Sequence, residues 1–179
     1  GQFTGTLTRA TVESVGNYAY SIGTLTLGSN FSITLNPCSL VIKPKLITVT
    51  VSPVSKPYDR TVNSVIPILS LQKGSEPYQV LESDFDQLSV TASLAQYETK
   101  EVGTNKVVIV SGITLSGTKA SNYSVNSSAR NSESSITPIS IFITNLTVDS
   151  KIYDGTNQAT LSGTPVLSGF RLSFLNVVI

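Results

Sequence analysis

The feature that most constrains this chain is a stretch that occurs twice. Residues 42–61 read IKPKLITVTVSPVSKPYDRT, and residues 136–156 read ITPISIFITNLTVDSKIYDGT. Each copy has a proline two residues after an isoleucine, then an apolar β-branched run, then Lys-x-Tyr-Asp-x-Thr. The copies lie 94 positions apart at the proline (44 to 138) and 95 apart at the tyrosine (58 to 153). This spacing is too long for a solenoid and predicts a string of small β domains.

The remainder of the repeat also recurs. Val15-Gly16 is matched by Val102-Gly103, and Asn30-Phe31-Ser32-Ile33 is matched by Asn122-Tyr123-Ser124-Val125. The chain is therefore expected to hold the back half of one module (1–44), a complete module (45–138) and the front of a third (139–179). We expect an all-β fold of immunoglobulin-like β-sandwich or β-grasp-like modules in tandem.

These residues carry a resemblance to known families. The turns at 56–61 and 151–156 resemble the Tyr-Asp-Gly signature of YDG repeats, and residues 101–125 are similar to the later half of that repeat. Residues 5–35 resemble the neighbouring MBG type. The resemblance makes 1–44 the C-terminal half of an MBG-like module, 45–138 a complete YDG-like module and 139–179 the start of a next YDG-like module. It implies tandem repeats of large secreted or surface adhesins of bacteria.

One residue departs from the family pattern. Arg60 stands where the family has glycine, as Gly155 does in the second copy. If the turn needs a left-handed backbone at this position, arginine costs about 1 kcal/mol there.

Composition limits the classes of partner. Only 13% of the 179 residues are charged, and the net charge of +1 gives no electrostatic case for binding nucleic acid or an anionic membrane. No apolar run approaches the roughly 18 residues that a membrane-spanning helix needs. The chain begins Gly1-Gln2 and contains no methionine, which we interpret as an excised or processed segment.

Several local predictions follow from pattern and turn chemistry. Pro44 should end one strand, with another beginning at Leu46. The Asp59 carboxylate should accept backbone N–H groups across its turn, and Asp154 stands at the same position of the second copy. Residues 126–135 are polar almost throughout and predict an exposed loop, followed by a long strand over 136–148. Residues 166–179 predict strands with an exposed apolar edge.

An acidic stretch supplies the candidate metal site. Glu82, Asp84 and Asp86 alternate along residues 81–88, and on a strand they would share one face. Calcium prefers such oxygen ligands, so a calcium site is one interpretation, and a solvated strand face or loop is the other. We expect no other cofactor.

Catalytic residues are scarce, which predicts that the chain is not an enzyme. It has no histidine, and its one cysteine, Cys38, is interpreted as a buried inert thiol rather than a reactive or intermolecular one. A Lys-Asn isopeptide crosslink would require Lys56 or Lys151 beside Asn122 and Asp59; surface lysines are the alternative.

Tyr58 and Tyr153 have a structural interpretation and a binding one. Repetition at one module position favours packing under a module junction over a glycan or protein contact.

The predicted function is that of a stalk or spacer in an extracellular bacterial adhesin or fibre, whose partners are neighbouring repeats or other copies. One alternative is a filament subunit that exchanges terminal strands between copies. The other is an adhesion module that binds a carbohydrate or protein on a host surface.

Overall fold

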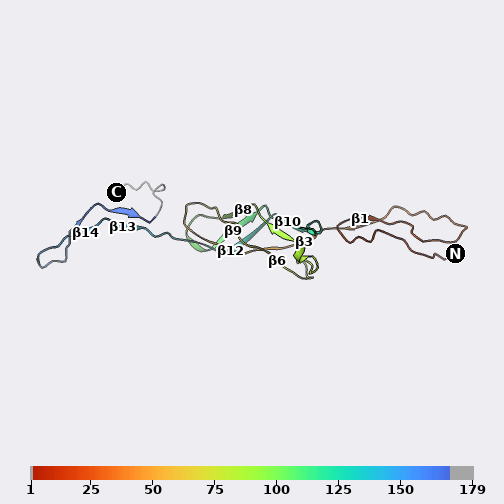
Figure 1. Cartoon of the computed structure of the whole chain (residues 1–179), viewed down its shortest axis with the longest axis horizontal. Helices are drawn as coiled ribbons and strands as arrows, with labels where there is room; N and C mark the ends of the chain where they lie inside the picture. Colours follow the sequence, from red (N-terminus) through yellow and green to blue (C-terminus); the bar gives the residue numbers. More distant parts are fainter. Residues whose placement is uncertain (1, 170–179) are drawn as a thin grey trace.

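The computed structural model describes residues 2–169 and is nearly all-β. Figure 1 shows an elongated molecule in which the N-terminal segment (2–44) and the C-terminal segment (138–169) extend from opposite ends of a thicker central module (45–137). The buried side chains of the described residues all lie in this module, between Ile47 and Ile136.

The N-terminal segment is a narrow ribbon. Its strands β1 (Gly16–Ala19) and β2 (Ser39–Ile42) pair antiparallel, with Gly16 opposite Ile42. Single bridges join Thr4 to Thr26 and Thr8 to Ser21. Strand β2 ends two residues before Pro44 and the next strand begins at Lys45, so the predicted break at this proline is confirmed.

The central module contains strands β3 to β12 and two 3-10 helices. The strands are β3 (Lys45–Ile47), β4 (Val49–Val51), β5 (Ser55–Pro57), β6 (Leu69–Leu71), β7 (Ser89–Thr91), β8 (Leu94–Tyr97), β9 (Gly103–Ser111), β10 (Thr114–Ser116), β11 (Tyr123–Val125) and β12 (Ser128–Thr137). The helices are η1 (Phe85–Gln87) and η2 (Ala120–Asn122). The largest sheet has the order β5-β12-β9-β8, and smaller sheets pair β4 with β6, β3 with β11 and β7 with β10. The strands form a curled half-barrel.

Two strands near the start of this module run parallel to its last two strands. Strand β5 pairs with β12, with Ser55 opposite Ser135 and Pro57 opposite Thr137, and β3 pairs parallel with β11. Because the first strands enter at Lys45 and run in the same direction as β12, the chain leaves at Thr137 from the end opposite to its entry. Figure 1 shows the two outer segments attached at these two ends.

Two adjoining apolar clusters form the core. The larger contains Val49, Val108, Val110 and Ile136 with their neighbours, and the smaller contains Ile47, Val80 and Tyr123. Leu71 and Val125 contact both clusters and join them.

The predicted exposed loop at 126–135 is wrong, because most of it is β12, a central strand of the largest sheet. Its polar residues replace missing ladder bonds at a register shift between Asn131 and Ser134. The Asn131 side-chain amide donates to Val51 O (2.9 Å), and the buried Ser134 hydroxyl accepts the Val54 N–H (3.1 Å) and donates to Asn131 Oδ1 (3.1 Å). The polar composition therefore satisfies a β-bulge inside a sheet.

The long strand predicted over 136–148 is also wrong. Strand β12 ends at Thr137, and the C-terminal segment forms β13 (Phe142–Thr144), β14 (Thr147–Val148), β15 (Leu161–Ser162) and β16 (Val166–Ser168). Strand β13 pairs antiparallel with β16, as β4 pairs with β6 in the central module. The apolar edge predicted near the C-terminus, at 170–179, lies outside the described residues.

Candidate functional site

The Lys-x-Tyr-Asp-x-Thr turn is the best-defined polar arrangement in the described part of the chain. In the first copy, Asp59 Oδ1 accepts the Thr61 N–H (2.9 Å), the Thr61 hydroxyl (3.0 Å) and the Lys56 ammonium (2.7 Å). The bond to the Thr61 N–H is the one expected of an Asx-turn. Lys56 also donates to Thr61 O (2.8 Å), so that one carboxylate and one ammonium close both sides of the turn.

The first turn is anchored to the central module by further contacts. Lys56 Nζ donates to Asn63 O (2.7 Å) and lies 5.4 Å from the centre of the Tyr97 ring. Tyr58 packs against the larger core cluster, and its N–H donates to Thr137 O (2.9 Å) at the end of β12. The Lys56 side chain is only 15% exposed. Its oxygen partners and the aromatic ring offset the cost of burying the ammonium charge.

The Tyr97 ring packs against the Lys56 ammonium of this turn. Its hydroxyl lies 3.1 Å from Val54 O and 3.0 Å from Ser135 O, the two carbonyls that share its single proton. These carbonyls belong to the chain just before β5 and to β12, so the phenol joins the start of β5 to the last strand of the module. Burial, followed by the nearby Asp59 charge, raises the pKa of Tyr97.

The second copy repeats the local geometry. Asp154 Oδ1 accepts the Thr156 N–H (2.9 Å), the Thr156 hydroxyl (2.9 Å) and the Lys151 ammonium (2.9 Å), and Lys151 donates to Thr156 O (2.9 Å). Here the lysine side chain is 39% exposed and Tyr153 is 93% exposed. Tyr58 and Tyr153 therefore share a sequence position and differ in their surroundings.

Both turns stabilise the charged form of their aspartate. Burial raises the pKa of Asp59, but Lys56 and the Thr61 hydrogen bonds outweigh it and hold that pKa below its ordinary 3.8. For Asp154 the hydrogen bond from Lys151 is the largest cause of a lowered pKa, followed by the bond from the Thr156 N–H. Each ion pair fixes the backbone of its turn. In each, the lysine ammonium donates to the aspartate Oδ1, which also accepts the threonine bonds.

Arg60 adopts the left-handed conformation, which the sequence had left open as one of two possibilities for this turn. Its φ is +66°, and Gly155 at the same position of the second copy has a φ of +73°. Both turns thus require the backbone conformation that glycine adopts without strain, and Arg60 bears the cost.

The sequence predicted a role in the turn for the tyrosine and aspartate of each copy, and assigned none to the lysine and threonine of the same motif. Lys56, Thr61 and their counterparts Lys151 and Thr156 stand in both copies, and that repetition is the signal that could have identified them. Tyr97 carries no comparable signal, because its contact with Lys56 depends on the pairing of β8 with β9.

The acidic stretch does not form the predicted strand. Residues 82–84 are a turn and residues 85–87 are η1, so the alternation of Glu82, Asp84 and Asp86 does not align them on one strand face. Asp84 instead accepts the hydroxyls of Tyr123 (2.9 Å) and Ser83 (3.0 Å). Within residues 2–169 no group of three acidic, cysteine or histidine side chains is placed to hold a metal ion. The calcium hypothesis loses the geometry on which it rested.

The isopeptide hypothesis places Lys56 beside Asn122, and the structure does not bring these two side chains together. Lys56 contacts Asp59 at the exit end of the module, where β5 pairs with the end of β12. Asn122 lies at the entry end, next to Tyr123, which is opposite Lys45. The parallel strands that separate entry from exit also separate these two side chains.

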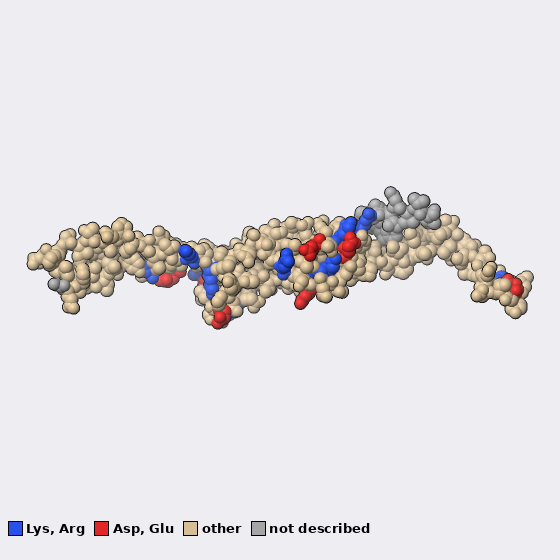
Figure 2. All heavy atoms as spheres, turned by 180° about the vertical axis from the view of Figure 1, so that it is seen from behind, with Lys and Arg blue, Asp and Glu red and all other residues tan. Residues whose placement is uncertain are grey.

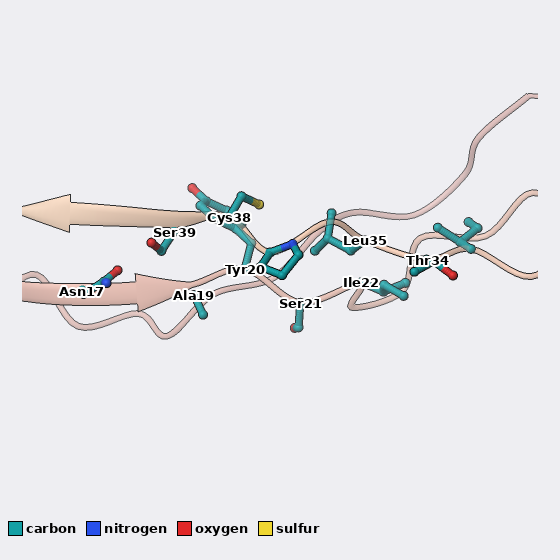
Figure 3. A pocket seen from close by; sticks show the side chains of 11 residues that line it. Asn17, Ala19, Tyr20, Ser21, Ile22, Thr34, Leu35, Cys38 and Ser39 are labelled. Atoms are coloured by element: carbon teal, nitrogen blue, oxygen red, sulfur yellow. The ribbon is translucent and has the colours of Figure 1, made fainter.

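Cys38 is exposed, which corrects the prediction of a buried thiol. It lies at a shallow groove on the N-terminal ribbon, and a ribbon of two narrow strands has no interior in which to bury a side chain. Figure 3 shows the lining side chains spread along the ribbon without converging on one point. They are Asn17, Ala19, Tyr20, Ser21, Ile22, Ile33, Thr34, Leu35, Pro37, Cys38 and Ser39.

The charged side chains are sparse on the face seen in Figure 2, and both signs are intermingled there. Among the described residues, none of the helices has the length and apolar character needed to span a bilayer.

Comparison with known proteins identifies the central module. Residues 43–131 match the YDG domain family, so the chain carries a YDG domain that includes the first of the two turns. No curated protein and no solved structure matches the chain. The MBG type of residues 1–44, the boundaries at 44 and 138 and the second YDG module remain predictions.

Proposed function

We propose that this chain, with its YDG domain at residues 43–131, is a non-enzymatic spacer segment of an extracellular bacterial adhesin or fibre. The observation that carries the proposal is the parallel pairing of β5 with β12. A module whose first and last strands were antiparallel would return the chain to its starting end. Parallel strands send it onward, so each added module lengthens the molecule.

The same pairing suits a module that bears tension. Pulling on residues 45 and 137 from outside draws β5 and β12 along each other, so their hydrogen bonds are loaded together and not one after another. Ser135 N–H to Val54 O (3.0 Å) and Tyr58 N–H to Thr137 O (2.9 Å) are two of these bonds. The hydroxyl pair of Ser55 and Ser135 (2.9 Å) and the Tyr97 phenol add side-chain links between the same strands.

The repeated turn supports a mechanical role over a chemical one. Lys56 and Asp59 are the most reactive types of side chain in the central turn, and each is engaged by several hydrogen bonds of the turn itself. A general acid or base needs a group that is free to exchange a proton with a substrate. Here the charges fix the backbone where β5 ends.

Single-molecule pulling tests this proposal. With handles at the two ends of the chain, the central module should unfold in one high-force step, with a contour-length gain of roughly 30 nm for its 93 residues. With handles at Ser93 and Ser111, which face each other across β8 and β9, the same protein should open at a lower force, because the bonds break in succession. Equal forces in the two geometries would contradict a spacer built to bear load.

A second candidate is favoured by one observation on the C-terminal segment. The repeat places Ile141 and Ile143 at the positions of Ile47 and Val49, which are 1% and 8% exposed, yet they are 51% and 63% exposed. This face would accept strands from another copy, which is the basis of the filament hypothesis. Light scattering over a range of concentrations tests it: a ladder of multiples supports strand exchange, and a constant mass near 19.0 kDa contradicts it.

A further inference from the structure

The N-terminal segment is joined to the central module by one covalent crossing and one side-chain hydrogen bond. The chain passes from β2 through Pro44 into β3. Beside it, Asn122 Oδ1 accepts the Val15 N–H at 3.0 Å, across 107 positions of sequence, and both residues are half-buried. Within the described residues, the Asn122 side chain makes this hydrogen bond and none to its own module.

The two connections lie next to each other by strand register. On the N-terminal side, Gly16 follows Val15 and is opposite Ile42. On the module side, Tyr123 follows Asn122 and is opposite Lys45. A single covalent crossing acts as a hinge, whereas two neighbouring connections resist both bending and twisting at Pro44.

Both partners of the bond recur along the chain. Asn122 is matched by Asn30, and Val15 is matched by Val102. Their settings correspond as well, since Gly103 pairs with Ile136 at the exit end as Gly16 pairs with Ile42 before the entry end. The central module therefore has the asparagine at its entry and a counterpart of the valine, Val102, near its exit.

We propose that Asn122 is a locking residue that fixes the junction between adjacent modules by accepting the Val15 N–H. The proposal rests on the proposed spacer function, since it states how neighbouring modules in a rod are kept in line. The partner of the lock is the backbone of the preceding module, so the bond depends on an oxygen acceptor at 122 and a free N–H at 15.

The test uses the whole chain with two spin labels, one on the exposed native Cys38 and one on E98C at the exit end of the module. The width of the distance distribution measures how far the junction bends, and its mean measures how extended the molecule is. N122A should broaden the distribution and make exchange of the Val15 amide about fivefold to tenfold faster, as expected for the loss of one hydrogen bond. N122D keeps an acceptor and should retain the narrow distribution.

Two further variants keep the outcome interpretable. N30A removes the counterpart asparagine, which forms no hydrogen bond through its side chain within residues 2–169, and should leave the width unchanged. V15P removes the same bond from the donor side and should broaden the distribution even if N122A perturbs the module. Unchanged widths in both N122A and V15P would overturn the lock, whereas a short mean distance in the wild type would overturn the rod and not the lock.

Discussion

The two Lys-x-Tyr-Asp-x-Thr turns have the same internal hydrogen bonds and different surroundings. In each, one aspartate oxygen accepts the threonine N–H, the threonine hydroxyl and the lysine ammonium. Among residues 2–169, only the first lysine also reaches a second carbonyl beyond the turn, Asn63 O, and an aromatic ring, that of Tyr97. The turn is therefore encoded by its own six residues, and the folded module adds burial and anchorage.

The two turns should differ most in the effect of removing their lysine. K56A should lower the free energy of unfolding of the central module by about 2–3 kcal/mol, because it leaves Asp59 and Asn63 O without their cation in a half-buried site. K151A should change the same transition by less than about 0.5 kcal/mol, as expected for an exposed pair. Urea unfolding followed by circular dichroism measures both variants. Equal effects would show that burial does not distinguish the turns.

Removal of the Tyr97 hydroxyl tests the anchorage that only the first turn has. Y97F keeps the ring under Lys56 and should cost about 1–2 kcal/mol, because Val54 O and Ser135 O lose their shared donor. The same urea experiment measures it. A neutral Y97F would mean that the phenol does not join the start of β5 to the last strand.

The aspartates predict a pH dependence common to both turns. Since the pKa of folded Asp59 lies below the ordinary 3.8, its contribution to stability is complete above pH 3.8 and is lost as the pH falls through the lower folded value. D59N should be less stable than the wild type by about 1 kcal/mol at neutral pH, a modest figure because this carboxylate is half exposed. The difference should shrink below pH 3.8, and a difference that is constant across this range would contradict the ion pair.

The smallest expected effect concerns the left-handed position. R60G should stabilise the central module by up to about 1 kcal/mol, offset in part by the greater freedom of glycine in the unfolded chain. G155R is the matched reverse change: nothing lies within 4 Å of a Cβ at Gly155, so backbone strain is its main cost. It should leave unfolding of the central module unchanged. A destabilising R60G would mean that the arginine side chain contributes more than its backbone costs.

The turn and the break at Pro44 could be predicted because short-range chemistry decides them. The Asp59 side chain needs only the N–H of a neighbouring residue to form its turn. Pro44 ends a strand because it has no N–H to donate. Strand β12 could not be predicted from its composition, because the partners of Asn131 and Ser134 are Val51 O and Val54 N–H, about 80 positions away. The exposure of Cys38 likewise depends on how thin the surrounding ribbon is.

The acidic stretch has the alternating carboxylates of a strand face but does not form a strand. Alternating carboxylates share a face only on a strand, and Leu81 to Leu88 instead folds as turns and η1 over the smaller core cluster. Phe85 and Leu88 pack against that cluster, and their spacing fits a 3-10 turn. Long-range packing thus decided the local conformation.

Small-angle X-ray scattering of the chain in dilute solution tests the onward path of the chain, since strands β3 and β5, parallel to β11 and β12, put entry and exit at opposite ends of the module. A compact fold of 179 residues would have a radius of gyration of about 16 Å. We expect a radius of gyration well above this value, with the scattering of a thin rod. A radius close to about 16 Å, with the outer segments folded against the central module, would contradict it.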